Sequence, residues 1–229
     1  TIAVVPTAGT ATVSRLDLNG SGATVDLKGQ NQAVGQLVSV NPLPGMGGTV
    51  TNTGALAIFT NSSQAGNSTF GGQITGAIAF NRIGANTTTL TNSNTYTGAT
   101  TIRGGQLQLR DSGAISSTAG LTLNYGSLLW DNFGLNASGT PNPVRVQPSN
   151  PVTMQGGSIT INGAGSTDNT ATFNTVTVTG VDDDGSTDTD DDGLPDAWEL
   201  SYFGDLSTNG GSDPDGDDFG NLETIAKVT

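Results

Sequence analysis

Residues 90–109 read Leu90-Thr-Asn-Ser-Asn-Thr-Tyr-Thr-Gly-Ala-Thr-Thr-Ile-Arg-Gly-Gly-Gln-Leu-Gln-Leu109, and they show the pattern that decides the fold. Apolar and polar residues alternate in Leu107-Gln-Leu109, as they do along a strand with one buried face. Gly104-Gly105 stands directly before this run, where a turn is expected. Threonine and asparagine supply many of the other residues. The stretch therefore predicts short β-strands separated by tight turns.

The same pattern recurs on both sides of this stretch, from about residue 10 to residue 180. The other alternating runs are Ala23–Leu27, Leu37–Val40, Leu56–Phe59, Ile74–Phe80, Leu121–Leu123, Val144–Val146, Ile159–Ile161, Ala171–Phe173 and Val176–Val178. Glycine, asparagine, serine or proline separates almost every pair of runs, for example at Asn19-Gly20 and Gly156-Gly157. No sustained helical period occurs before residue 195. An all-β fold is therefore predicted for this part of the chain.

The scarcity of aromatic residues favours a solenoid over a β-sandwich. The aromatic residues of this part are Phe59, Phe70, Phe80, Tyr96, Tyr125, Trp130, Phe133 and Phe173. A thin core of valine, isoleucine, leucine and alanine suits stacked rungs. Asparagine and threonine can also repeat from rung to rung and form hydrogen-bonded ladders.

The segment that contains Asn94–Ile102, Gly105, Leu107 and Leu109 resembles the autotransporter-associated β-strand repeat of bacterial surface proteins. Gly71–Ile78 is similar to the rung that precedes this repeat, and Ala23–Val38 has a related pattern. The resemblance implies a right-handed parallel β-helix exposed outside the cell. It brings no catalytic residues with it.

Three regions follow from these patterns. Residues 1–9 form a strand candidate, either part of its own domain or donated to a neighbouring subunit. Residues 10–180 form the solenoid, with a proline-rich excursion at 131–150 that is a poor central strand. Residues 181–229 are expected to form a separate acidic module.

Charge is concentrated in the last region, which contains 15 of the 20 acidic residues. Asp188–Glu199 has the spacing of a twelve-residue calcium loop, with glycine at the sharp turn. The predicted ligands of this first loop are Asp188, Asp190, Asp192, the carbonyl oxygen of Leu194, Asp196 and Glu199. A solvated acidic linker is the alternative.

A second loop begins at Asp213 and departs from the full pattern at two positions. Asp218 stands where glycine is expected, and Thr224 stands at the closing position, one residue after Glu223. The predicted ligands are Asp213, Asp215, Asp217, the carbonyl oxygen of Phe219, Asn221 and Glu223. Two Ca²⁺ sites are thus expected, the second weaker than the first.

The paired loops resemble the thrombospondin type 3-like calcium repeats of bacterial secreted proteins, and dockerin modules more distantly. A short helix is expected after the first loop, over 195–203, and another over 221–228. No helix is predicted to enter either loop, so a sensor EF-hand pair is not expected. With few large apolar side chains, this module needs metal to fold, which predicts a structural role for Ca²⁺.

Composition excludes several classes of chemistry. The chain contains no cysteine and no histidine, which removes disulfides, thiolate chemistry and a Ser-His-Asp triad. The sequence contains no cluster of basic residues, so a nucleic-acid partner is not expected. No apolar stretch is long enough to span a membrane.

We therefore expect an extracellular structural protein that assembles head to tail with copies of itself into a calcium-stabilised filament or surface layer. A surface adhesin with a glycan partner is the alternative; it needs exposed aromatic residues, for which Tyr125, Trp130 and Phe133 are the candidates. A β-helix polysaccharide lyase or hydrolase is less favoured, because the acidic residues of the body are far apart in sequence. Arg110 and Asp111 are expected to point to opposite faces of a strand.

Overall fold

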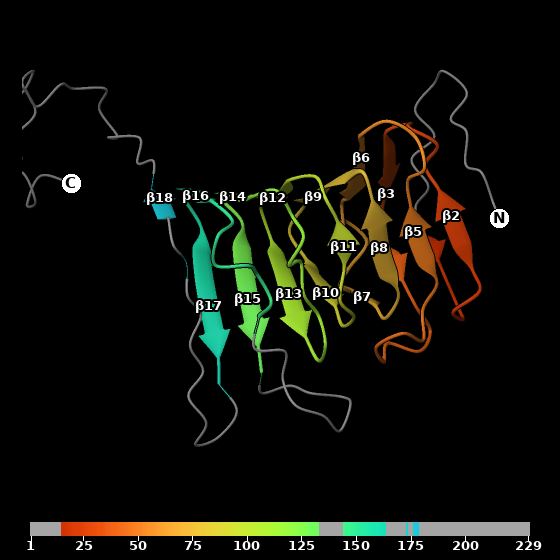
Figure 1. Cartoon of the computed structure of the whole chain (residues 1–229). Helices are drawn as coiled ribbons and strands as arrows, with labels where there is room; N and C mark the ends of the chain where they lie inside the picture. The colour runs from red at the N-terminus through yellow and green to blue at the C-terminus, as the bar shows by residue number, and fades with distance from the viewer. Residues whose placement is uncertain (1–14, 133–143, 164–172, 174–175, 179–229) are drawn as a thin grey trace, which may run out of the picture. The chain divides into compact units, whose positions relative to one another are not determined.

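The computed structural model describes residues 15–132, 144–163, 173 and 176–178. The chain divides into two units, Thr1–Thr179 and Gly180–Thr229, and every described residue belongs to the first. Within the described residues all regular structure is β-strand, and every pair of strands is parallel (Figure 1). The prediction of an all-β parallel solenoid is therefore confirmed for this unit.

The strands form three faces of the solenoid. One face holds the five-stranded sheet of β7 (Ser68–Phe70), β10 (Thr87–Leu90), β13 (Gln106–Arg110), β15 (Ser127–Asp131) and β17 (Ser158–Asn162), and the pair β1 (Leu16–Asp17) and β4 (Leu37–Val38). A second holds β2 (Thr24–Asp26), β5 (Thr49–Thr51), β8 (Gln73–Gly76) and β11 (Thr95–Tyr96). The third holds the seven-stranded sheet of β3 (Gln32–Val34), β6 (Ala57–Asn61), β9 (Ile78–Ile83), β12 (Thr100–Arg103), β14 (Leu121–Asn124), β16 (Val152–Gln155) and β18 (Val176–Val178).

The turns up to β12 visit the three faces in the same order, and after β11 the described residues add strands only to the five-stranded and seven-stranded sheets. Strands of one sheet therefore come from successive turns. The seven-stranded sheet receives one strand from each turn, which gives seven rungs. Figure 1 shows β13, β15 and β17 as neighbouring parallel arrows. From β6 to β14 the rungs repeat after 20 or 21 residues, but 31 residues separate Asn124 from Gln155. The longer repeat accommodates the excursion predicted at 131–150.

The core is built from columns of inward-pointing side chains that stack from rung to rung. Phe59 of β6 pairs in register with Phe80 of β9, and their ring centroids lie 6.2 Å apart. Phe80 also contacts Tyr96, with 5.9 Å between ring centroids. All three rings are buried because alternate residues of each strand face the interior. Sequence alternation thus translates directly into a continuous apolar core.

Glycine forms the corner at which the chain passes from the seven-stranded to the five-stranded sheet. Gly104, Tyr125 and Gly156 occupy equivalent corners and all have a left-handed backbone, with φ of 76°, 55° and 84°. The residue after each of them is glycine, and a Cβ atom at Gly157 would clash with the carbonyl oxygen of Gly126. Glycine is therefore a steric requirement at the second position of this corner, whereas the first position also accepts a tyrosine with a left-handed backbone.

Two local predictions were wrong. Val144–Val146 is not a strand: it is an irregular segment in which Arg145 and Val146 are buried. The run Ile74–Phe80 is not one strand, because Gly76 adopts φ of 83° and separates β8 from β9. The alternation of residue types at 144–146 does not match the burial, because the adjacent residues Arg145 and Val146 are both buried and Val144 is exposed.

Candidate functional site

The predicted calcium ligands of both loops, from Asp188 to Glu223, lie outside the described residues, and so does the N-terminal strand candidate at 1–9. The helices expected over 195–203 and 221–228 lie outside them too. The two-site calcium module therefore stays a prediction. Within the described ranges, no group of three or more acidic side chains is arranged to hold a metal ion. Nor does any helix there have the length and apolar character needed to cross a bilayer.

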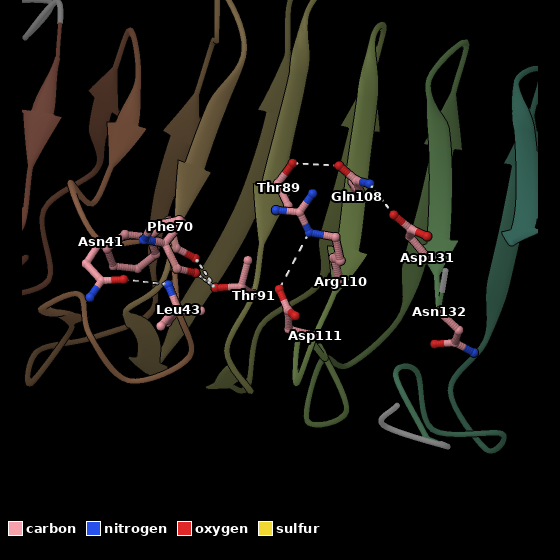
Figure 2. Close-up of polar contacts among 12 residues, drawn as sticks. Asn41, Leu43, Phe70, Thr89, Thr91, Gln108, Arg110, Asp111, Asp131 and Asn132 are labelled. Carbon is pink, nitrogen blue, oxygen red and sulfur yellow. Dashed lines mark hydrogen bonds and ion pairs between the residues drawn. The ribbon is translucent and has the colours of Figure 1, made fainter. Parts of the chain in front are cut away.

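A row of polar side chains crosses the five-stranded sheet (Figure 2), and two of them, Thr89 and Asp131, are buried. Thr89 Oγ1 of β10 donates to Gln108 Oε1 of β13 at 2.7 Å. Gln108 Nε2 in turn donates to Asp131 Oδ2 of β15, also at 2.7 Å. Thr89 and Gln108 are register partners, whereas Asp131 lies two residues beyond Leu129, the register partner of Gln108, so the row runs diagonally at its third rung. It is a hydrogen-bonded ladder that ties neighbouring rungs together.

Arg110 and Asp111 lie at the carboxyl end of β13, beside this row. Arg110 Nε and Asp111 Oδ2 are 3.5 Å apart, so the two side chains form an ion pair (Figure 2). The expectation that they point to opposite faces was wrong. Asp111 follows the last residue of the strand and adopts φ of 53°, which turns its side chain back toward Arg110.

Arg145 connects the end of β15 to the turn that follows β13. Its guanidinium is fully buried, donates to Asn132 Oδ1 at 2.8 and 3.1 Å, and also donates to the carbonyl oxygens of Asp131 and Gly113. Burial lowers the pKa of Arg145 to about 10, while the charges of Asp131 and Asp111 act in the opposite direction. The side chain is therefore still a cation at neutral pH.

The Arg145 clamp, defined as Arg145, Asp111, Asp131, Asn132 and Gly113, holds the return of the excursion against the solenoid. The backbone contributes as well, because Ile115 N donates to Arg145 O at 2.7 Å. Both carboxylates are 4 % exposed. Arg110 forms an ion pair with Asp111, and both carboxylates act electrostatically on Arg145, which is the arrangement of a structural lock.

Asp26 organises a turn on the opposite part of the unit. Its carboxylate accepts hydrogen bonds from the backbone N–H groups of Lys28 and Thr53, both at 3.0 Å, and from the Thr53 hydroxyl at 2.7 Å. It also forms an ion pair with Lys28 Nζ at 2.8 Å. These contacts, that of Lys28 first, hold the pKa of Asp26 well below its usual range. The neighbouring residue Lys28 has φ of 54°, so the carboxylate secures a left-handed turn.

The three aromatic residues considered for glycan binding do not share a surface in the described structure. Trp130 lies on β15 at a position that faces the core of the solenoid, and its side chain is 3 % exposed. Tyr125 is 73 % exposed at a glycine-lined corner, and Phe133 lies outside the described residues. Trp130 is thus unable to stack on a sugar from solution.

Sequence reasoning missed the Arg145 clamp. Its members come from β13, β15 and the end of the excursion, and they meet only through the rung register. A lone arginine inside a proline-rich loop of a chain with few basic residues was the available signal. Its partners could be located only from the strand register, which places Arg110 of β13 beside Asp131 of β15 and cannot be read from the sequence.

Comparison with known proteins gives one match. Residues 81–109 match the family model of the passenger-associated-transport-repeat. No curated protein and no solved structure matches the chain. The matched residues span the end of β9, all of β10, β11 and β12, and most of β13, so they cover one complete rung. The chain thus carries an autotransporter-associated repeat within a parallel β-solenoid whose described residues form seven rungs.

Proposed function

We propose that this chain is an extracellular structural protein of a bacterial surface, which joins copies of itself end to end into a calcium-stabilised filament or layer. The repeat at residues 81–109 and the parallel solenoid support a surface repeat protein. The end-to-end assembly is the more specific part of the proposal. The proposal includes no enzymatic activity.

The observation that carries the assembly is the uncovered last rung of the described solenoid. Within the described residues β17 pairs only with β15, and β18 pairs only with β16. Ile161 of β17 is 37 % exposed and Val176 of β18 is 44 % exposed. Their partners one rung earlier, Trp130 and Val152, are 3 % and 0 % exposed. A further rung would complete both columns.

A second copy can supply that rung through its own first strands. In the described structure β2 and β3 stand at the other ends of their sheets, so each has one edge with no neighbouring strand. Edge strands of this kind offer unpaired backbone groups to another chain. A contact between different ends of the same subunit repeats without closing and produces a filament.

Charge supports the same picture. Residues 1–180 contain five acidic and six basic residues, so solenoids do not repel each other strongly. Residues 181–229 contain 15 acidic residues and one basic residue. Ca²⁺ bound by Asp188–Glu199 and by the loop that begins at Asp213 would offset part of this charge and fix the module.

The assembly is tested with Ile161→Lys, which places a charge in the uncovered column. Thr160→Lys is the matched control, because Thr160 is an exposed residue of the same strand in the neighbouring register position. Light scattering in Ca²⁺ should show that Ile161→Lys stays small while the control assembles like the wild type. Circular dichroism verifies that both variants fold. Equal assembly of Ile161→Lys and the wild type would overturn the proposed interface.

A further inference from the structure

Arg82 is a fully buried cation inside the solenoid. It lies on β9, and its relative exposure is 0 %. In the register of the seven-stranded sheet it stands between Asn61 of β6 and Ile102 of β12, both also fully buried. Its side chain therefore occupies an inward column that is otherwise filled by neutral residues.

The contacts of this guanidinium leave part of it without a partner. Nη1 donates to the carbonyl oxygens of Ile83 and Gly84, the latter at 3.1 Å. Nε and Nη2 are buried and have no hydrogen-bond partner. Among the described residues, no carboxylate lies within ion-pair distance of Arg82. Burial lowers its pKa to about 10, so it stays charged at neutral pH.

Asn61 adds a third donor beside it. Asn61 Nδ2 is buried and also has no partner. Its Oδ1 accepts from Ser63 N at 3.1 Å and from the Ser63 hydroxyl at 2.7 Å. A backbone N–H can only donate, so the amide cannot be flipped to exchange its oxygen and nitrogen. Three buried donor nitrogens and one positive charge thus stand on adjacent rungs with no acceptor.

A buried charge without a counterion is strongly unfavourable, and arginine does not lose its proton to escape the penalty. A water molecule would satisfy the N–H groups but would leave the charge unbalanced. We propose that Arg82 and Asn61 form an internal binding site for a small monovalent anion such as chloride. The site lies outside the predicted calcium loops and is independent of assembly.

The glycine corner at Gly105 packs closely against the guanidinium of Arg82. Arg82 Nη2 lies 2.5 Å from the position that a Cβ atom of Gly105 would occupy. Gly105 has φ of 56° and is partly exposed, as is Gly104. A side chain at Gly105 would therefore displace the guanidinium, so glycine is needed at this position.

The first experiment measures thermal unfolding of the full chain at constant ionic strength while sodium gluconate is replaced by sodium chloride, with EGTA present throughout. A ligand that binds only the folded state raises the unfolding midpoint as its concentration rises. The midpoint of the wild type should therefore increase with chloride. Arg103→Met, at an exposed arginine of β12, is the matched control and should respond like the wild type. Arg82→Met should show no chloride response.

A second experiment tests the anion site even if Arg82→Met does not fold. Wild-type crystals soaked in bromide should show an anomalous peak at contact distance from Arg82 Nη2 and Asn61 Nδ2. A water molecule or no density at this position would overturn the proposal. Identical midpoints in chloride and gluconate would overturn it as well.

Discussion

At the scale of the residue, the few charges of the solenoid body act as locks on irregular backbone. Asp26 secures the left-handed turn at Lys28, and the Arg145 clamp secures the end of the excursion. Strands of two to six residues leave many turns to be fixed. Buried polar groups are stable only where every one has a partner, so these residues tolerate little change.

Replacing Arg145 with methionine should be strongly destabilising. The variant retains most of the apolar stem but leaves Asp111 and Asp131 buried without this cation, at a cost of about 3 kcal/mol. Arg103→Met, at an exposed position, should change the unfolding free energy by less than about 0.5 kcal/mol. Chemical denaturation measures both variants. Equal stability of the two would show that the clamp is dispensable.

Asp26 predicts a specific acid dependence. Because its pKa is lower in the folded state than in the unfolded chain, its contribution to stability is complete above about pH 4. That contribution is lost as the pH falls toward the folded-state pKa. Asp26→Asn should therefore lose less stability than the wild type between pH 5 and pH 2.5. Thermal unfolding in EGTA measures the difference.

Thr53→Val serves as the intermediate case for this prediction. It removes only the hydroxyl that donates to Asp26 Oδ2, so its acid dependence should fall between those of the wild type and Asp26→Asn. Identical acid dependence in all three proteins would show that Asp26 does not contribute.

At the scale of the element, the corner between the seven-stranded and five-stranded sheets limits which residues can be substituted. Gly157→Ala should destabilise the protein by about 1–3 kcal/mol, because φ is 95° and the new methyl group would meet the Gly126 carbonyl. Gly22→Ala is the control, since a Cβ atom there meets nothing within 4 Å. Denaturant titration should separate the two variants clearly. Comparable losses in both would contradict the steric account of the corner.

The positions of the strands could be predicted from the sequence, but the structure of the segments that connect them could be predicted only partly. Alternation located strands such as β13, since each rung buries every second side chain. It failed at Val144–Val146, where burial follows from the contacts of Arg145 and from packing of Val146. It also gave no register, so the meeting of Arg110, Asp111 and Asp131 could not be foreseen.

The whole molecule combines a solenoid that is nearly neutral with a strongly acidic C-terminal region. The solenoid supplies stacked edges at its two described ends. The acidic region supplies twelve predicted calcium ligands, which lie outside the described residues. Assembly and calcium dependence are separate parts of the proposal, and one measurement can distinguish them.

That measurement is negative-stain electron microscopy of the full chain in Ca²⁺ and after addition of EGTA. The account predicts filaments or layers with a repeat set by the solenoid in Ca²⁺, and dispersed particles after chelation. Filaments that persist in EGTA would contradict the role of calcium. Single dispersed subunits in Ca²⁺ would contradict the central claim that this chain builds an extracellular assembly.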